Sequence, residues 1–148
     1  MDYFFFLSKY FCLGILVKRD AMSANMFRIL LAGSDSRLLA TRAAVLLKTG
    51  AVVVYRDTPG TLNILDRETF DLVVLCHSLP QEDVAVIVDK VRQKISDAKI
   101  LMVTSELDGY RTQGDGKIDA TSLPEPGQLV ALAKQLLEVY SFASHAGA

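Results

Sequence analysis

The chain from residue 27 onward alternates between two patterns of apolar positions. Short runs rich in Val, Ile and Leu are separated by longer stretches in which apolar residues recur every three or four positions. The short runs are typical of strands buried on both faces of a parallel sheet, and the longer stretches are typical of helices with one apolar stripe. The pattern predicts five strands, over residues 27–32, 51–55, 71–76, 99–104 and 118–122.

The residues between these strands place the helix boundaries. Ser34, Asp35 and Ser36 offer side-chain oxygens that cap a helix N-terminus, and Gly50 marks the end of that helix. Pro59 suits the first turn of a second helix. Further helices are predicted over residues 81–96 and 128–140, whereas residues 106–117 contain three glycines and no helical period.

Strands that alternate with helices predict right-handed βαβ units and a parallel sheet with helices on both faces. We therefore expect a three-layer α/β fold, a doubly wound, flavodoxin-like sheet of five strands in the order 2-1-3-4-5. The functional crevice of such a sheet lies at the carboxyl ends of the first and third strands. The residues at these two ends are Gly33, Ser34 and Asp35, and Cys76, His77 and Ser78.

Residues 26–140 form the predicted domain, and the residues on either side do not share its pattern. Six of the chain's twelve Phe and Tyr residues fall within the first eleven positions. The apolar stretch there is shorter than the roughly 20 residues that a spanning helix needs, and no basic residue precedes it as in a secretory signal. Residues 1–25 are therefore either a non-native extension from a start codon placed too early, or a short membrane-associating anchor with Lys18 and Arg19 on its cytoplasmic side. We expect residues 141–148 to form a frayed tail.

Composition narrows the classes of function. The net charge is −1, which does not favour binding to nucleic acid or to an anionic membrane. Cys12 and Cys76 lie far apart and outside any CxxC motif. This spacing argues against a zinc site or a disulfide scaffold and fits a reducing cytoplasm. We predict no metal and no cofactor, because two histidines are too few for a histidine metal cluster without distant carboxylates.

The order and spacing of several landmarks resemble those of the receiver domain of bacterial response regulators, as in the chemotaxis regulator. The landmarks are the strands over 28–32 and 71–75, Pro80, the switch hydroxyl of Thr104 after strand four, and Gly116, Asp119 and Pro124 around strand five. The resemblance covers residues 26–140 and implies the sheet order given above.

The residues that carry receiver chemistry do not match. The family's paired acidic residues, which hold Mg²⁺, correspond to Gly33 and Ser34, and only the next residue, Asp35, is acidic. The phosphate-accepting aspartate corresponds to Cys76, and the lysine before the strand-five proline corresponds to Leu123. Acyl phosphate formation needs a carboxylate nucleophile, a carboxylate-held Mg²⁺ and a cation near the new phosphate. The helix that the family has after strand four is shortened or absent.

The resemblance and these departures together favour a pseudo-receiver, a protein-interaction module of bacterial signal transduction that works without phosphorylation and is not an enzyme. The alternative is a thiol-based redox sensor or a small enzyme that uses Cys76, with His77 as its neighbour. Successive residues on a strand point to opposite faces, so His77 is badly placed to activate Cys76 unless the chain turns there. The sequence places no lysine or arginine beside Cys76.

The expected partner is another signalling protein or a second copy of the chain. The resemblance implies an output surface on strands four and five and the last helix. On that helix, Val130 and Leu137 lie one heptad apart and off the predicted core stripe of Leu129, Leu132, Ala133, Leu136 and Tyr140. The two residues either border the core or form a seam for a partner or a dimer.

Overall fold

A computed structural model describes residues 26–104 and 117–147, with side chains described as far as residue 138. Its five strands form one sheet in the order β2-β1-β3-β4-β5, and every neighbouring pair is parallel. The strands are β1 (Arg28–Ala32), β2 (Val52–Arg56), β3 (Leu72–Leu75), β4 (Lys99–Val103) and β5 (Ala120–Ser122). The helices are α2 (Ser36–Leu46), the 3₁₀ turn η1 (Leu47–Thr49), α3 (Thr58–Leu65), α4 (Gln81–Lys94) and α5 (Pro126–Gly147). The predicted fold class and strand order are confirmed.

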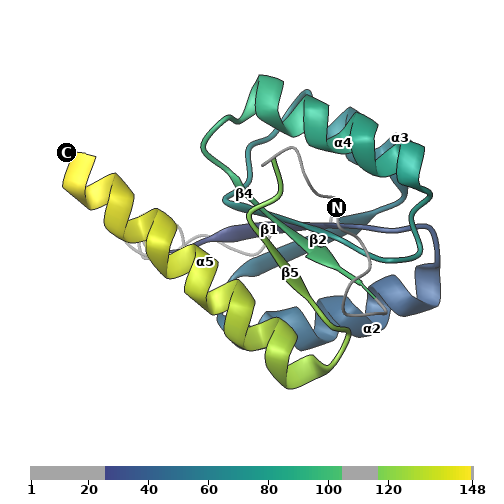
Figure 1. Cartoon of the computed structure of the whole chain (residues 1–148), viewed down its shortest axis with the longest axis horizontal. Coiled ribbons are helices and arrows are strands. Elements are labelled where there is room, and N and C mark those ends of the chain that lie inside the picture. The colour runs from purple at the N-terminus through teal and green to yellow at the C-terminus, as the bar shows by residue number, and fades with distance from the viewer. Residues whose placement is uncertain (1–25, 105–116, 148) are drawn as a thin grey trace, which may run out of the picture.

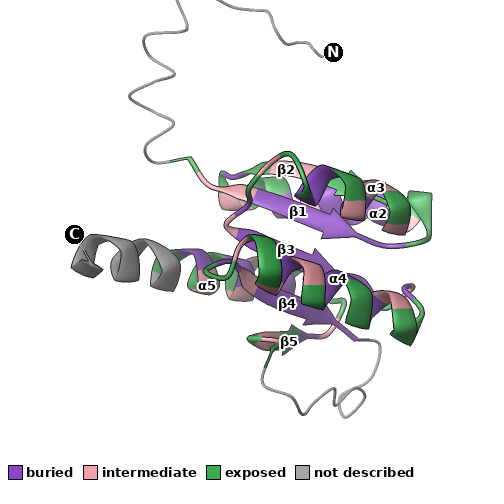
Figure 2. Ribbon diagram, turned by 90° about the horizontal axis from the view of Figure 1, so that it is seen from above, coloured by how far each residue is buried: buried purple, intermediate pink, exposed green. Residues whose placement is uncertain are grey.

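Helices cover both faces of the sheet, α3 and α4 on one and α2 and α5 on the other (Figure 1). Each face has its own apolar core, because successive strand residues point to opposite sides. Leu30 and Val73 pack toward α3 and α4, whereas Ile29 and Val74 pack toward α2 and α5. The central strands β1, β3 and β4 are buried along nearly their whole length (Figure 2). This double burial explains why these strands read as continuous apolar runs in the sequence.

The open edge of the sheet at β2 is only partly covered, and Val52 and Tyr55 are exposed. The carbonyl of Arg56 accepts a hydrogen bond from the Gly33 N–H at 3.2 Å, so Arg56 faces β1. The preceding carbonyl, that of Tyr55, therefore points to the open edge, because backbone groups alternate in direction along a strand. Nη1 of Arg56 donates to this Tyr55 carbonyl at 2.8 Å.

Several predicted boundaries shift. Strand β3 ends at Leu75 rather than at Cys76. The Cys76 N–H still bonds to Ala32, but the chain turns at once, with the Leu79 N–H donating to the Cys76 carbonyl at 3.2 Å. Strand β5 begins at Ala120 rather than at residue 118. Residues 105–116 lie outside the described residues, as do residues 1–25. The predicted loop over 106–117 and the shortened fourth helix fall almost entirely within the first of these gaps.

The last helix differs from the prediction in length and in its buried stripe. Helix α5 continues to Gly147, beyond residue 140, where the sequence pattern ends it. No proline or glycine interrupts residues 128–146, so nothing in the sequence ends the helix earlier. Leu129, Ala133 and Leu137 form the buried stripe, and Leu137 is only 3% exposed. Leu137 therefore belongs to the core, and the predicted seam that paired it with Val130 is wrong for this residue.

Candidate functional site

The predicted crevice lies where β1 and β3 end side by side. Ala32 and Leu75 are register partners, so the residues after them meet at one edge of the sheet. The Cys76 N–H donates to the Ala32 carbonyl at 2.9 Å and closes the floor of the crevice. The structure thus brings together Gly33, Ser34 and Cys76, as the strand pattern predicts.

A side chain at Gly33 would crowd three neighbouring side chains. A Cβ atom at this position would lie 2.9 Å from Cδ2 of Leu39, 3.2 Å from Cβ of Cys76 and 3.2 Å from Oγ of Ser78. The first distance is shorter than real Cβ contacts allow, so a neighbour would have to move. Gly33 corresponds to one of the receiver's metal-holding acids. Neighbouring side chains take up the space that an acidic side chain at this position would use.

Ser34 and Ser78 close the mouth of the crevice with two hydrogen bonds, which we call the serine clasp. The Ser34 N–H donates to Oγ of Ser78 at 3.1 Å, and Oγ of Ser34 donates to the Ser78 carbonyl at 2.7 Å. The hydroxyl of Ser34 is therefore engaged with the loop after β3.

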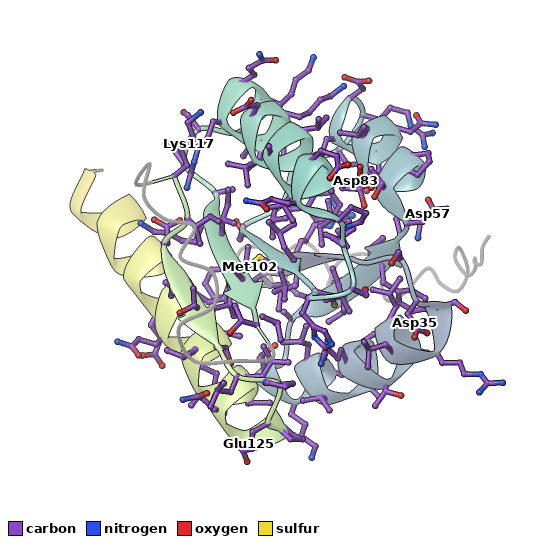
Figure 3. All side chains as sticks on the ribbon, turned by 45° about the vertical axis from the view of Figure 1, so that its right-hand side comes forward. Asp35, Asp57, Asp83, Met102, Lys117 and Glu125 are labelled. Atoms are coloured by element: carbon purple, nitrogen blue, oxygen red, sulfur yellow. The ribbon has the colours of Figure 1, made fainter. Side chains whose placement is uncertain are left out.

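Asp35, the remaining acidic residue of this region, caps a helix. Its Oδ1 accepts hydrogen bonds from the backbone N–H groups of Arg37 and Leu38, at 3.0 and 3.3 Å. Figure 3 shows Asp35 at the periphery of the molecule, at the start of α2. A carboxylate at this position is stabilised by the exposed N–H groups and the dipole of the helix.

Cys76 is fully buried, and the cation beside it was not predicted. Burial raises the pKa of the Cys76 thiol, and the neighbouring Arg42 guanidinium offsets only part of that shift. Arg42 reaches the crevice from α2, and only 6% of its surface is exposed. The sequence alone forces no cation to this place, and the structure supplies Arg42 there. The signal was present in the sequence, because Arg42 falls on the apolar stripe of α2 between Leu39 and Leu46.

His77 contacts Arg42 instead of serving Cys76. Nη1 of Arg42 lies 3.5 Å from Nδ1 of His77. Desolvation, with the positive charge of Arg42 as a second cause, lowers the pKa of His77. A lowered pKa favours the neutral imidazole, and Nδ1 can accept a hydrogen bond from Arg42 only if the ring proton is on Nε2. Among the described residues, no hydrogen bond joins His77 to the Cys76 thiol.

Thr104 and Leu123 follow the neighbouring strands β4 and β5. Thr104 is buried, and its backbone N–H donates to the Ser122 carbonyl at 2.8 Å. Leu123 is half-buried, and its backbone N–H donates to Oε1 of Gln128 at 2.9 Å. The side chain at position 123 is an apolar one, so it supplies no charge to the end of β5.

The residues of the crevice do not fit a magnesium ion. Within residues 26–104 and 117–138, no group of three or more His, Cys, Asp or Glu side chains could hold a metal. Mg²⁺ prefers carboxylate oxygens and its own waters, whereas Gly33, Ser34 and Cys76 offer no charge and Arg42 adds a positive one.

In the described part of the chain, no helix is long and apolar enough to cross a membrane.

Comparison with solved structures adds evidence on the fold. No family model matches the sequence, and no curated protein matches it. A CheY-like response regulator receiver domain protein from Methanospirillum hungatei is similar at a TM-score of 0.68 and 20% identity, over 80% of this chain and 98% of that one. The signal receiver domain of a putative Luxo repressor from Vibrio parahaemolyticus is similar at a TM-score of 0.71 and 12% identity, over 83% and 98%.

A third similar structure contains bound ligands. It is a response regulator from Thermotoga maritima in complex with Mg²⁺ and BeF, similar at a TM-score of 0.66 and 20% identity, over 75% of this chain and 99% of that one. These similarities extend over nearly the full length of each matched chain, and the strand order agrees with them. The chain therefore has the fold of the CheY-like response regulator receiver domain.

Proposed function

We propose that the protein is a pseudo-receiver, a protein-interaction module of bacterial signal transduction that acts without aspartyl phosphorylation. The observation that carries this proposal is the buried guanidinium of Arg42 beside Cys76, in a crevice without a carboxylate. Phosphoryl transfer to a receiver requires a carboxylate nucleophile and a divalent cation. Here the nucleophile is replaced by a thiol, and a fixed positive charge stands where a metal would need negative ligands.

The packing around Gly33 and the serine clasp support the same proposal. Both features fill the space between the ends of β1 and β3. A module with a filled crevice transmits information through its surface, so its partner is another signalling protein or a second copy of the chain. We place this function in the cytoplasm, because Cys76 is a free buried thiol, which fits a reducing compartment.

The alternative use of Cys76 as a redox or catalytic nucleophile gains no support from its surroundings. Reactive cysteines are partly exposed and have a lowered pKa. Cys76 is fully buried, and the pKa of its thiol is raised because desolvation outweighs the influence of Arg42. His77 is turned toward Arg42 and is not available as its base.

The test is intact-mass spectrometry of the unmodified protein after incubation with acetyl phosphate and Mg²⁺. We expect no added phosphoryl group, because the nucleophile and the metal site are both missing. A receiver domain with its full acidic set, treated in the same tube, is the positive control. A one-phosphoryl adduct that hydroxylamine removes would overturn the proposal, because acyl phosphates have that lability.

The interaction part of the proposal is tested separately by co-purification from the native cell. A partner should bind equally well with and without acetyl phosphate and Mg²⁺. Binding that depends on acetyl phosphate would contradict phosphorylation independence even if the mass measurement were negative.

A further inference from the structure

Three exposed apolar side chains lie at the end of the sheet where β1 and β2 begin. Met26, Leu47 and Val52 are 38%, 56% and 40% exposed. The Val52 N–H donates to the Phe27 carbonyl at 2.9 Å, so Met26 lies one residue away from that contact. Leu47 follows α2, and its carbonyl accepts from the Gly50 N–H at 3.0 Å in the turn that leads into β2. We call Met26, Leu47 and Val52 the amino-edge patch.

Helix α5 continues past the sheet at this same end of the molecule. The helix contacts η1, which leads into β2, and its Leu137 packs in one core with Leu46 and Ala51. Residues 139–147 extend α5 beyond the sheet (Figure 1). The sequence of this continuation is VYSFASHAG, which contains no Asp, Glu, Lys or Arg. Most helical stability in proteins comes from tertiary packing, so an uncharged continuation of this kind calls for a neighbour.

Residues 1–25 join the domain beside the patch, because Met26 follows them in the chain. The stretch from residue 3 to residue 17 contains six Phe and Tyr residues and a single charged residue, Lys9. Residues 18–25 link this stretch to Met26, and an extended link of this length spans up to about 27 Å. The α5 continuation is about 14 Å long. The link is therefore long enough for the aromatic stretch to lie along the patch and the continuation.

We propose that residues 3–17 dock on their own chain, on the amino-edge patch and the continuation of α5. Removal of apolar and aromatic surface from water drives the contact. A short flexible link makes the contact intramolecular, with an effective concentration of about millimolar, so a weak affinity is sufficient. The docked stretch covers a surface and does not complete the core, so the domain folds without it. This inference does not depend on the pseudo-receiver proposal, because it involves no residue of the crevice.

Paramagnetic relaxation in NMR spectra of the full chain tests the contact. In the variant Cys76→Ala, Cys12 is the only cysteine, and it lies within the docking stretch. A nitroxide attached to Cys12 should broaden the amide signals of Leu47, Val52 and the α5 continuation, and should leave the signal of Val86 on α4 sharp. Chemical reduction of the nitroxide should restore the broadened signals. Sharp signals at all of these positions, or equal broadening over the whole domain, would overturn the inference.

A double variant tests the role of the patch. Leu47→Gln and Val52→Thr together make the patch polar, and both positions are exposed, so the fold should be retained. The nitroxide on Cys12 should no longer broaden the α5 continuation in this variant. Val86→Thr removes an equally exposed valine on α4 and is the matched control, which should keep the broadening. Undiminished broadening in L47Q/V52T would contradict docking on the patch.

Two further samples separate this contact from the other partners that an aromatic segment can take. Spin-labelled chains mixed with isotope-labelled, unmodified chains should show no broadening, because the contact lies within one chain. Broadening in that mixture would assign the contact to a second copy. Vesicles of phosphatidylcholine and phosphatidylglycerol should leave the broadening in the spin-labelled chain unchanged. Its loss on addition of vesicles would identify the segment as a membrane anchor, and either result would overturn the inference.

A dye measurement keeps the inference testable if the nitroxide itself prevents docking. Release of the aromatic stretch exposes more apolar surface than the two substitutions remove, so L47Q/V52T should bind more of a hydrophobic fluorescent dye than the unmodified full chain. A patch that is already open predicts the opposite sign, because the double variant has then only lost two exposed apolar side chains. Weaker dye binding by L47Q/V52T would therefore show that residues 3–17 do not cover the patch.

Discussion

Arg42 of helix α2 and His77 of the turn after strand β3 are 35 residues apart in the chain and 3.5 Å apart in space, Nη1 to Nδ1. The contact orders the imidazole so that its Nδ1 is an acceptor. It also places the permanent positive charge of Arg42 beside the His77 imidazole, which becomes positively charged itself when it is protonated. The pair therefore makes stability depend on pH.

We expect the free energy of unfolding to fall as the pH is lowered through the range in which histidine titrates, about pH 7 to pH 5. The pKa of His77 is lowered in the folded state, first by desolvation and then by Arg42, so the unfolded chain binds the proton more tightly. Stability is thus fully present above the unfolded pKa and is lost as the pH falls toward the folded one. Urea unfolding at a series of pH values measures the effect.

The control for this prediction is His77→Gln, which should flatten the pH dependence, while Arg42→Met should weaken it. The Cys76 thiol, the other titratable group in contact with Arg42, stays protonated throughout this range because its pKa is raised. An unchanged slope in H77Q would assign the pH dependence to another group.

Gly33→Ala should destabilise the domain by about 1–3 kcal/mol, the usual cost of overpacking a filled core. The added methyl would lie 2.9 Å from Leu39 and 3.2 Å from Cys76. Chemical denaturation gives the difference, and Ser36→Ala at the exposed start of α2 is a control that adds no volume. A neutral G33A would show that Leu39 moves aside without cost.

Restoring the nucleophile alone should not restore phosphorylation. Cys76→Asp provides a carboxylate, but that carboxylate pairs with Arg42 and lacks the acidic neighbours that would hold Mg²⁺. Intact-mass spectrometry of C76D after acetyl phosphate and Mg²⁺ should show no adduct. Adding Gly33→Asp should destabilise the protein, because the new side chain would crowd Leu39 and Cys76. An adduct on C76D would mean that the crevice recruits a metal despite Arg42.

Two substitutions on α5 distinguish core from surface on this helix. Leu137→Lys should cost several kcal/mol of stability, because a buried leucine is replaced by an unpaired charge. Val130→Lys should be tolerated, because Val130 is only half-buried. Thermal unfolding checks both variants. Only V130K can then be used to ask whether this side of α5 binds a partner, and a folded L137K would show that α5 can shift off the sheet.

A chain that begins at Met26 should fold alone and unfold cooperatively within a few degrees of the full chain. Strand β1 begins at Arg28, and its core neighbours lie within the described domain. Calorimetry and circular dichroism measure the outcome. Loss of folded protein would show that the aromatic N-terminal segment packs against the domain.

The strand order and the meeting of Gly33, Ser34 and Cys76 could be predicted because they depend on periodicity. Apolar runs of five residues separated by amphipathic stretches restrict the chain to one class of topology, and the strand ends then fall at one edge of the sheet. The structure confirms the strand order and the meeting of these three residues. Both follow from local periodicity, so no knowledge of long-range contacts was needed to predict them.

Other features depend on tertiary packing and could not be predicted from periodicity. The sequence pattern places Leu137 off the core because Leu132 and Leu136 are equally apolar, and only the packing of α5 on the sheet selects the stripe of Leu129, Ala133 and Leu137. Arg42 lies on the apolar stripe of α2, but a long basic side chain on such a stripe usually reaches solvent. Its burial is set by the turn after β3, which comes from a distant part of the chain.

The side chain of Arg56 has a consequence for association. A strand added at β2 would need the outward Tyr55 carbonyl, and the Arg56 guanidinium already occupies it. A charged cover of this kind discourages edge-to-edge pairing between sheets. A second copy of the chain would then meet this one through helices or loops, and a ten-stranded sheet continuous across two molecules is disfavoured.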